Sequence, residues 1–303
     1  MKNVVERVFV NDQFYDPHTV PFSVFDHGLL YGDGVFEGIR IISNGVLLLQ
    51  EHVDRLYESA ACIRMAMPYD AEQMRKNVLL TVGQSGLSDG YIRLVVTRGV
   101  GDLGINPTRC LAPTVIIIAS KLALYPEEFY RKGLDVHICQ TRKPDSTQMP
   151  GAAKTCNYMN NILAASEYVA AGCQEGLLLT PDGFVCEATA DNVFFIRDNT
   201  LFTPSLDTNC LPGITRAQVL RIAREQGFAT EEGRYLPSDL LAAEEVFLTG
   251  TGAGIIAAAR IQGQSIGSGR MGPKTERLRN AYEAAIPSLL TPVTNHAIPE
   301  LVQ

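Results

Sequence analysis

The sequence lacks any hydrophobic run long enough to cross a bilayer. Its longest apolar stretches, such as Val115 to Ala119, have the length of a single strand, whereas a membrane-spanning helix needs about 20 apolar residues. The first residues, Met1 to Arg7, enter a strand pattern directly and do not contain the apolar core of a secretory signal. These absences predict a cytoplasmic protein with no membrane partner.

Cysteine and charge are also sparse. The 7 cysteines are scattered along 303 residues at spacings that suit neither a metal site nor a disulfide framework, so we expect reduced thiols and no bound metal. Charged residues make up 19%, the net charge is −7, and no basic stripe is present, which argues against a nucleic-acid partner. Neither repeats nor low-complexity segments interrupt a chain long enough for two cores.

Hydrophobic periodicity and glycine or proline punctuation predict an α/β protein, with α+β order in its first half. In that half, we expect strands at residues 4–10, 45–49, 91–98 and 113–120 and helices at 51–65 and 71–84. In the second half, we expect strands at 135–139, 175–179, 184–186, 192–197, 200–202 and 245–249, and helices from residue 158 to Gly172 and at 215–226 and 237–243. The predicted boundaries are a small N-terminal domain at 1–121, a linker at 122–132, a larger C-terminal domain at 133–290 and a poorly packed tail at 291–303.

Lys154 is the most informative single residue because of its neighbours. It lies among the small residues of Gly151 to Tyr158, a stretch without an acid to hold its ammonium. A poorly solvated lysine loses part of its preference for the charged form, and a neutral amine is what Schiff-base chemistry requires. Taken alone, however, a lysine of this kind is far more often an ordinary solvated side chain.

Two segments have the composition of phosphate-binding loops. Leu211 to Arg216 is a turn that leads into a helix, where the backbone N–H groups of Ile214 and Thr215 would face an anion. Thr249 to Gly254 follows a strand and contains three glycines, which allow close backbone approach to a ligand. A capped helix start and a glycine turn explain the two segments equally well when each is considered alone. Arg55 is the candidate cation, although such an arginine often pairs with a nearby acid.

Glu187 stands between apolar and small residues where two predicted strands meet. A carboxylate in such surroundings is costly unless it holds a proton or a cation. Opposite a pyridine nitrogen, it would keep that nitrogen protonated and make the ring an electron sink. The alternative is a glutamate at an exposed turn.

Together these residues resemble the class IV (fold-type IV) pyridoxal-phosphate aminotransferases, and most closely the branched-chain amino acid aminotransferases. The resemblance runs from Val8 to about Ile286 and rests on six motifs in order. They are Tyr31 to Arg40 for the substrate pocket, His52 to Leu56 for the phosphate arginine, Lys154 to Asn161 for the Schiff base, Glu187 to Phe194 for the pyridine partner, and Leu211 to Arg216 and Gly250–Thr251 for the phosphate loops.

The resemblance implies two α/β domains with pyridoxal 5′-phosphate (PLP) between them. It also implies a homodimer in which the loop at 99–107 reaches the partner's active site. The reaction would move the amino group of leucine, isoleucine or valine to 2-oxoglutarate, so the partners are small amino acids and 2-keto acids. Lys154 would hold the cofactor as a Schiff base and then shuttle the proton at the substrate Cα. The cofactor residues implied are Arg55, Lys154, Tyr158, Glu187, Ile214, Thr215, Gly250 and Thr251.

Substrate recognition is also implied residue by residue. The substrate residues are Tyr31, Phe36, Arg40, Tyr91, Arg93, Arg98, Thr251 and Gly252. Arg93 would meet the distal carboxylate of glutamate, while Tyr31, Phe36 and Tyr91 would form an apolar wall. One pocket would then admit both an apolar and an anionic side chain.

Four alternatives are weighed at the level of sequence. D-Amino-acid transaminases carry an Arg-x-His trap, whereas Arg98-Gly99-Val100 has no histidine; the spacing from Lys154 to Tyr158 nevertheless occurs in them and in aminodeoxychorismate lyases. The absence of tryptophan removes an aromatic wall that some relatives use. Gly99 to Gly104 satisfies a dinucleotide pattern but is followed by Asn106-Pro107 rather than by a helix. A protein that binds the cofactor without catalysis would need neither Glu187 nor a substrate arginine.

Overall fold

The computed structural model describes residues 7–121 and 125–293. Contacts between Cα atoms divide the described chain into two compact units. Unit 1 contains residues up to 121 together with 153–157 and 287–293, and unit 2 contains residues 125–152 and 158–286. The segment around Lys154 therefore belongs to unit 1, although the chain on either side of it belongs to unit 2.

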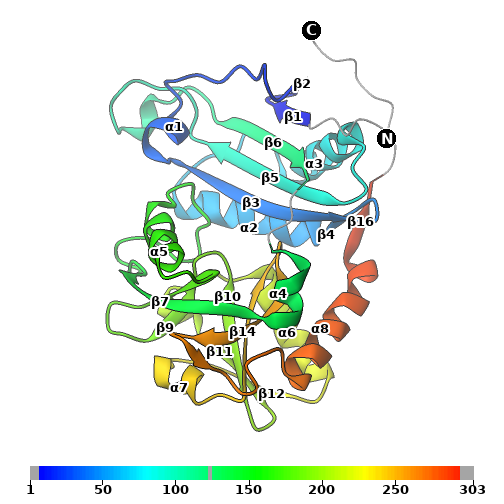
Figure 1. Cartoon of the computed structure of the whole chain (residues 1–303). Helices are drawn as coiled ribbons and strands as arrows, with labels where there is room; N and C mark the ends of the chain where they lie inside the picture. The colour runs from blue at the N-terminus through cyan, green and yellow to red at the C-terminus, as the bar shows by residue number, and fades with distance from the viewer. Residues whose placement is uncertain (1–6, 122–124, 294–303) are drawn as a thin grey trace. The chain divides into compact units, whose positions relative to one another are not determined.

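Unit 1 is built on a seven-stranded antiparallel sheet in the order β16-β4-β3-β5-β6-β1-β2 (Figure 1). Its strands are β1 (Arg7–Val10), β2 (Gln13–Tyr15), β3 (Gly34–Ile42), β4 (Gly45–Leu47), β5 (Gly90–Thr97), β6 (Thr114–Ser120) and β16 (Leu290–Pro292). Its helices are α1 (His27–Tyr31), α2 (Leu49–Cys62), α3 (Ala71–Ser85) and the short 3₁₀ helix η1 (Pro107–Arg109).

The side chains of β3 and β5 alternate between two faces of this sheet. Fully buried side chains of one face join α2 and α3 in the core of unit 1; they include Val35, Ile39, Ile41, Ile92 and Leu94. Because the side-chain period of a strand is two, the residues between them point to the opposite face. That second face carries Phe36 and Arg40 of β3 and Tyr91 and Arg93 of β5.

Local chemistry explains the clear limits of α3. The Asp70 carboxylate accepts a hydrogen bond from the N–H of Gln73 at 2.7 Å, which satisfies one of the free donors of the first turn. Gly86 ends the helix in the left-handed conformation, with φ of 64°. These two residues place the helix limits within one residue of the predicted 71–84.

Unit 2 is built on a nine-stranded mixed sheet whose main path is β12-β11-β10-β13-β14-β7-β8-β9, with β15 paired to β14. Its strands are β7 (Leu134–Arg142), β8 (Glu175–Leu179), β9 (Val185–Ala188), β10 (Asn192–Arg197), β11 (Thr200–Pro204), β12 (Ala229–Gly233), β13 (Glu245–Gly250), β14 (Gly254–Ile261) and β15 (Gln264–Ser265). Its helices are α4 (Glu127–Lys132), α5 (Met159–Ala170), η2 (Leu206–Thr208), α6 (Ile214–Glu225), α7 (Pro237–Leu241) and α8 (Pro273–Ala285), from which η3 (Ile286–Leu289) leads to β16. In neither unit do the described residues form a helix long and apolar enough to cross a membrane.

The mixed α/β class is confirmed. The sequence did not predict the strands β2, β3, β12, β14, β15 and β16 or the helices α1, α4 and α8. Where the predicted tail begins, β16 pairs with β4 and Val293 packs against the core of unit 1. The predicted linker contains α4, whose Phe129 and Tyr130 pack against the core of unit 2. Residues 4–6 of the first predicted strand, 122–124 of the linker and 294–303 of the tail lie outside the described residues. The domain boundaries themselves stay predictions.

Candidate functional site

The segment that carries Lys154 runs along the edge of β3. The N–H of Phe36 donates to the Lys154 carbonyl at 3.0 Å, and the N–H of Cys156 donates to the Gly34 carbonyl at 2.8 Å. The Lys154 N–H donates to the Ser59 hydroxyl of α2, also at 3.0 Å. Backbone hydrogen bonds therefore fix the position from which the Lys154 side chain projects.

Within unit 1, the Lys154 amine shares a surface with predicted substrate residues. Its Nζ lies 4.7 Å from the centre of the Phe36 ring. The Arg93 guanidinium lies 4.5 Å from the same ring and 5.9 Å from the Tyr91 ring. The register of β3 and β5 places Gly38 opposite Arg93 and Arg40 opposite Tyr91. This face thus combines aromatic surface, two arginines and a primary amine.

Arg55 is held by a carboxylate that its sequence neighbours do not suggest. Its Nε and Nη2 donate to the two oxygens of Glu37 on β3, each at 2.7 Å. The Nδ1–H of His52 donates to Glu37 at 2.7 Å as well, because an ionised carboxylate can only accept. Glu37 therefore orients Arg55, the predicted phosphate ligand. The sequence analysis predicted Arg55 but not its pairing with Glu37.

The buried group of Glu37, His52 and Arg55 carries a defined charge. Burial by itself would raise the pKa of Glu37, but the contacts with His52 and Arg55 outweigh burial and hold its pKa at about 2. Burial lowers the pKa of His52 from its ordinary 6.5 by more than the Glu37 carboxylate raises it. At neutral pH the group thus comprises one anion, one cation and a neutral imidazole.

Two other predicted substrate residues have structural contacts in unit 1. Arg98 donates to both oxygens of Asp33, at 2.9 and 3.0 Å, and to the carbonyls of Ile63 and Arg64. The Tyr31 hydroxyl donates to the Leu103 carbonyl. The contacts of Arg98 tie the end of β5 to the end of α2, and the roles of Arg98 and Tyr31 toward substrate stay predictions.

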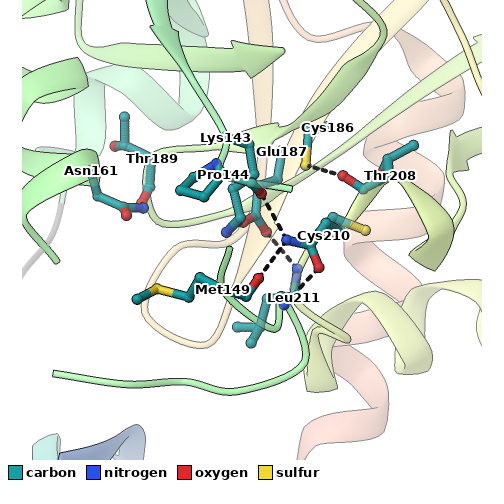
Figure 2. A network of polar contacts seen from close by, with 12 residues as sticks. Lys143, Pro144, Met149, Asn161, Cys186, Glu187, Thr189, Thr208, Cys210 and Leu211 are labelled. Atoms are coloured by element: carbon teal, nitrogen blue, oxygen red, sulfur yellow. Dashed lines mark hydrogen bonds and ion pairs between the residues drawn. The ribbon is translucent and has the colours of Figure 1, made fainter. Parts of the chain in front are cut away.

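In unit 2, the predicted pyridine partner Glu187 has two donors (Figure 2). The Lys143 ammonium forms an ion pair with its Oε1. The Leu211 N–H donates to its Oε2 at 2.9 Å. The side chains of Lys143 and Glu187 are only 15% and 8% exposed, so the carboxylate that the sequence places in apolar surroundings does hold a cation, as its cost requires.

Lys143 was missed by sequence reasoning. Burial by itself would lower the pKa of its ammonium, but the Glu187 carboxylate outweighs burial and raises the pKa above its ordinary 10.5. Lys143-Pro144 directly follows β7, which the sequence predicted only as far as residue 139. The available signal was this proline, because proline cannot donate to a sheet and so limits how far the strand can extend.

Asn209 forms hydrogen bonds through its side chain with residues 144–151, the segment that follows Lys143. It has a left-handed backbone, with φ of 65°, which asparagine tolerates better than most residues. Its Nδ2 donates to the carbonyls of Pro144 and Met149 at 2.8 and 2.9 Å, and its Oδ1 accepts from the Gly151 N–H at 2.7 Å. The segment before Lys154 is thereby bound to the segment before α6.

The two predicted phosphate loops form a helix start and a hairpin turn. Helix α6 begins at Ile214 after Gly213, and no described side chain caps its first turn, so its N–H groups remain suited to an anion. Gly250 pairs with Gly254 at the end of the β13–β14 hairpin, with Thr251 and Gly252 in its turn. Within the described chain, the buried hydroxyl of Thr249 has no hydrogen-bond partner.

The remaining predictions concern Tyr158 and the dinucleotide pattern. Tyr158 directly precedes α5 as its N-cap residue. After Gly104, the next elements are the three-residue η1 and the strand β6, so the pattern lacks the helix that a dinucleotide site needs. In the described part of the chain, no three His, Cys, Asp or Glu side chains are grouped as metal ligands.

Comparison with known proteins identifies related sequences and structures. The amino-transferase class IV family matches residues 34–261. A branched-chain-amino-acid aminotransferase of Pseudomonas aeruginosa is 35% identical over 264 residues, which cover 86% of this chain and 86% of that protein.

Solved structures agree over nearly the whole chain. The branched-chain amino acid aminotransferase of Escherichia coli has a TM-score of 0.92 at 30% identity, covering 95% of this chain and 99% of that one. The branched-chain amino acid aminotransferase of the thermophilic archaeon Thermoproteus uzoniensis, solved with norvaline, has a TM-score of 0.88 at 32% identity, covering 95% and 99%. A third branched-chain amino acid aminotransferase, at 35% identity and a TM-score of 0.90, was solved with pyridoxamine 5′-phosphate and covers 95% and 98%. The same enzyme was also solved in complex with N-(5′-phosphopyridoxyl)-L-glutamate.

Proposed function

The chain belongs to the class IV aminotransferase family, and on this basis we propose that it transfers the amino group of branched-chain L-amino acids to 2-oxoglutarate with PLP as cofactor. Relatives that match most of the chain are named branched-chain-amino-acid aminotransferases. These relatives support this activity over a D-amino-acid transaminase or a lyase.

The observation that carries the proposal is the second face of the unit 1 sheet. There the Lys154 amine and the Arg93 guanidinium lie near the same Phe36 ring centre, at 4.7 and 4.5 Å. An apolar side chain such as that of leucine can pack on the aromatic rings, whereas the distal carboxylate of glutamate can pair with an arginine. The two substrates of the reaction need both properties.

The residues of unit 2 fit the cofactor. The uncapped start of α6 and the buried Thr249 hydroxyl, which has no partner among described groups, are donors suited to a phosphate. Glu187 has used one acceptor position on each oxygen, and an ionised carboxylate has about four, so it can accept a further N–H from a pyridine ring.

When bound, PLP supplies an aldehyde that captures amines and a ring that withdraws electrons from the substrate Cα. Lys154 would hold the cofactor and afterwards move the proton at the substrate Cα. Glu187 would accept a hydrogen bond from the ring nitrogen, and Tyr158 would donate one to the phenolic oxygen. The residues that would bind the phosphate are Arg55, Ile214, Thr215, Gly250 and Thr251. Those that would bind the substrate are Tyr31, Phe36, Arg40, Tyr91, Arg93, Arg98, Thr251 and Gly252.

The visible spectrum of the PLP-loaded protein tests this function. We expect a yellow absorption band that L-leucine bleaches and that 2-oxoglutarate restores, while D-alanine leaves it unchanged. Lys154→Ala should have no such band and at least about 10³-fold lower turnover, with an unchanged circular dichroism spectrum.

Three outcomes would contradict the assignment. Bleaching by D-alanine alone would place the protein among D-amino-acid transaminases. A band that no amino acid bleaches, with pyruvate released from aminodeoxychorismate, would identify a lyase. Turnover by Lys154→Ala equal to wild type would remove the proposed role of the lysine.

The proposal includes a homodimer with the loop at 99–107 near the partner's active site. Its support is a surface on unit 1, which we call the α1–loop surface, made by exposed apolar residues: Phe22, Val24, Phe25, Leu29, Tyr31, Val100, Leu103, Ile105 and Leu111. This surface has two segments, residues 22–31 and residues 100–111. They are joined by hydrogen bonds from His27 to the carbonyls of Asp102 and Gly99, and from the Gly101 N–H to the Phe25 carbonyl. Exposed apolar side chains gathered on two joined segments are typical of an interface.

We also propose a cytoplasmic location. All 7 cysteines lie within the described residues and none is in a disulfide, as is usual in a reducing compartment. Fractionation of the source cells, with the protein followed by antibody, tests this; recovery in a membrane or secreted fraction would contradict it.

A further inference from the structure

Lys143 forms an ion pair with Glu187, but none of the cofactor or substrate roles proposed above is assigned to it. Its N–H donates to the Leu179 carbonyl of β8 at 2.9 Å, so its backbone continues the pairing of β7 with β8. On the other side of β8, the register places Glu187 opposite Leu178. The side chains of Lys143 and Glu187 thus meet from the two strands that flank β8.

The position of the Lys143 ammonium is fixed by its surroundings. The carbonyl of the next residue, Pro144, accepts from Asn209 Nδ2 at 2.8 Å, which holds the backbone directly after Lys143. Glu187 is fixed in turn by the Leu211 N–H on its second oxygen. Both partners of the ion pair are therefore anchored through the backbone.

The Lys143–Glu187 ion pair is expected to contribute little to folding stability, but it places a cation next to the Glu187 carboxylate. Removing two charges from water is costly, so a buried ion pair adds little net free energy of folding. A cation beside a carboxylate, however, favours its ionised form. The raised pKa of Lys143 means that the cation is present at any pH at which the enzyme would work.

We propose that Lys143 is a positioning residue that holds the Glu187 carboxylate in one orientation and supplies its counter-charge, so that Glu187 can accept a hydrogen bond from the ring nitrogen of PLP. With the Lys143 cation beside it, Glu187 would accept a hydrogen bond from the N–H of the ring. Lys143 itself transfers no proton. This inference rests on the proposed function, in which Glu187 faces the ring.

The test compares Lys143→Met, Lys143→Arg and the control Lys76→Met in the PLP-loaded protein. Lys76 pairs with Glu72 on the exposed surface of α3, so the control removes an ion pair outside the site. The first readout is the ¹⁵N chemical shift of the ring nitrogen in labelled PLP. The second is the rate of the half-reaction with L-leucine.

Lys143→Met should move the ¹⁵N shift toward that of an unprotonated ring and slow the half-reaction on the order of tenfold, the effect of one pKa unit. The KM for L-leucine should change less than about twofold, because Lys143 does not touch the substrate. Lys143→Arg, which keeps the charge, should restore both readouts, and Lys76→Met should equal wild type.

A wild-type ¹⁵N shift and rate in Lys143→Met would overturn the proposal, even with a lowered Tm, because the pair would then be structural only. If Lys143→Met does not fold, Lys143→Gln tests the same point, since it can donate a hydrogen bond but carries no charge. Failure of the proposed function is distinguishable: the wild-type protein itself would then show no band bleached by an amino acid.

Discussion

Single residues in this protein take their chemistry from partners that lie far away in sequence. Arg55 is paired with Glu37 across 18 positions, and Glu187 with Lys143 across 44. Sequence reasoning finds Glu187 because an acid among apolar residues needs a cation, but not which residue supplies the cation. The choice among several lysines and arginines is made by strand register.

Arg93 supports a prediction at this scale. Its guanidinium lies 4.5 Å from the Phe36 ring, where a charged group of the substrate can meet it. Arg93→Ala should lower kcat/KM for 2-oxoglutarate by roughly 10- to 100-fold, the loss of a charge-assisted hydrogen bond. The kcat/KM for L-leucine should fall less than about threefold in steady-state assays.

The matched control is Arg75→Ala, which removes an exposed arginine of α3 that bonds Gln50 and should leave both substrates unaffected. Equal losses for 2-oxoglutarate and L-leucine in Arg93→Ala would mean that Arg93 does not distinguish them.

At the scale of elements, β3 joins the core of unit 1 to its candidate site. One face of β3 packs Val35, Ile39 and Ile41 into the core, and Glu37 on the same face holds Arg55 of α2. The opposite face carries Phe36, beside Lys154. Hydrophobic periodicity does not predict this strand, because Gly34, Gly38 and two charged residues interrupt its pattern.

The pairing between β3 and α2 makes stability depend on pH. The pKa of Glu37 is lowered from 4.5 to about 2, so its contribution is present above pH 4.5 and lost as pH falls toward 2; the shift corresponds to about 3 kcal/mol. The pKa of His52 is also lowered in the folded state, so the unfolded state takes up a proton first as pH falls. Folding stability therefore also decreases as pH falls below about 6.5. Urea unfolding at a series of pH values measures both.

In Glu37→Gln, the free energy of unfolding should fall less steeply between pH 4.5 and 2 than in wild type. Stability at pH 7 should fall by about 3–5 kcal/mol, because Arg55 loses its buried partner. The same substitution at Glu72, a fully exposed carboxylate of α3, is the control and should change stability little. If the free energy of unfolding of Glu37→Gln fell with pH as it does in wild type, this would contradict the role assigned to the buried carboxylate.

At the scale of the whole molecule, association is the property that the α1–loop surface predicts. Leu103, Ile105 and Leu111 are 69%, 81% and 89% exposed, whereas apolar side chains that gather on a surface usually meet a partner. We expect the wild-type protein to have the mass of a dimer in solution.

Ile105→Asp should shift this mass toward the monomer and lower turnover, because a charge would be buried at the interface. Light scattering during gel filtration measures the mass. The control is Leu236→Asp, which places the same charge on an exposed leucine of unit 2 at 47% exposure; a monomeric wild type, or equal effects of both variants, would contradict the interface.

The sequence by itself determined the family, the mixed α/β class and most helices and strands, because these depend on local periodicity and on motifs read in order. It also proposed the candidate site residues, whose roles stay predictions. Tertiary structure decided which residues are partners: Glu37 for Arg55, Lys143 for Glu187, and Asn209 for the segment before Lys154. It also placed residues 153–157 with unit 1 and paired β16 with β4. These contacts join segments distant in the chain, and their register is fixed by backbone hydrogen bonds and core packing that no local pattern encodes.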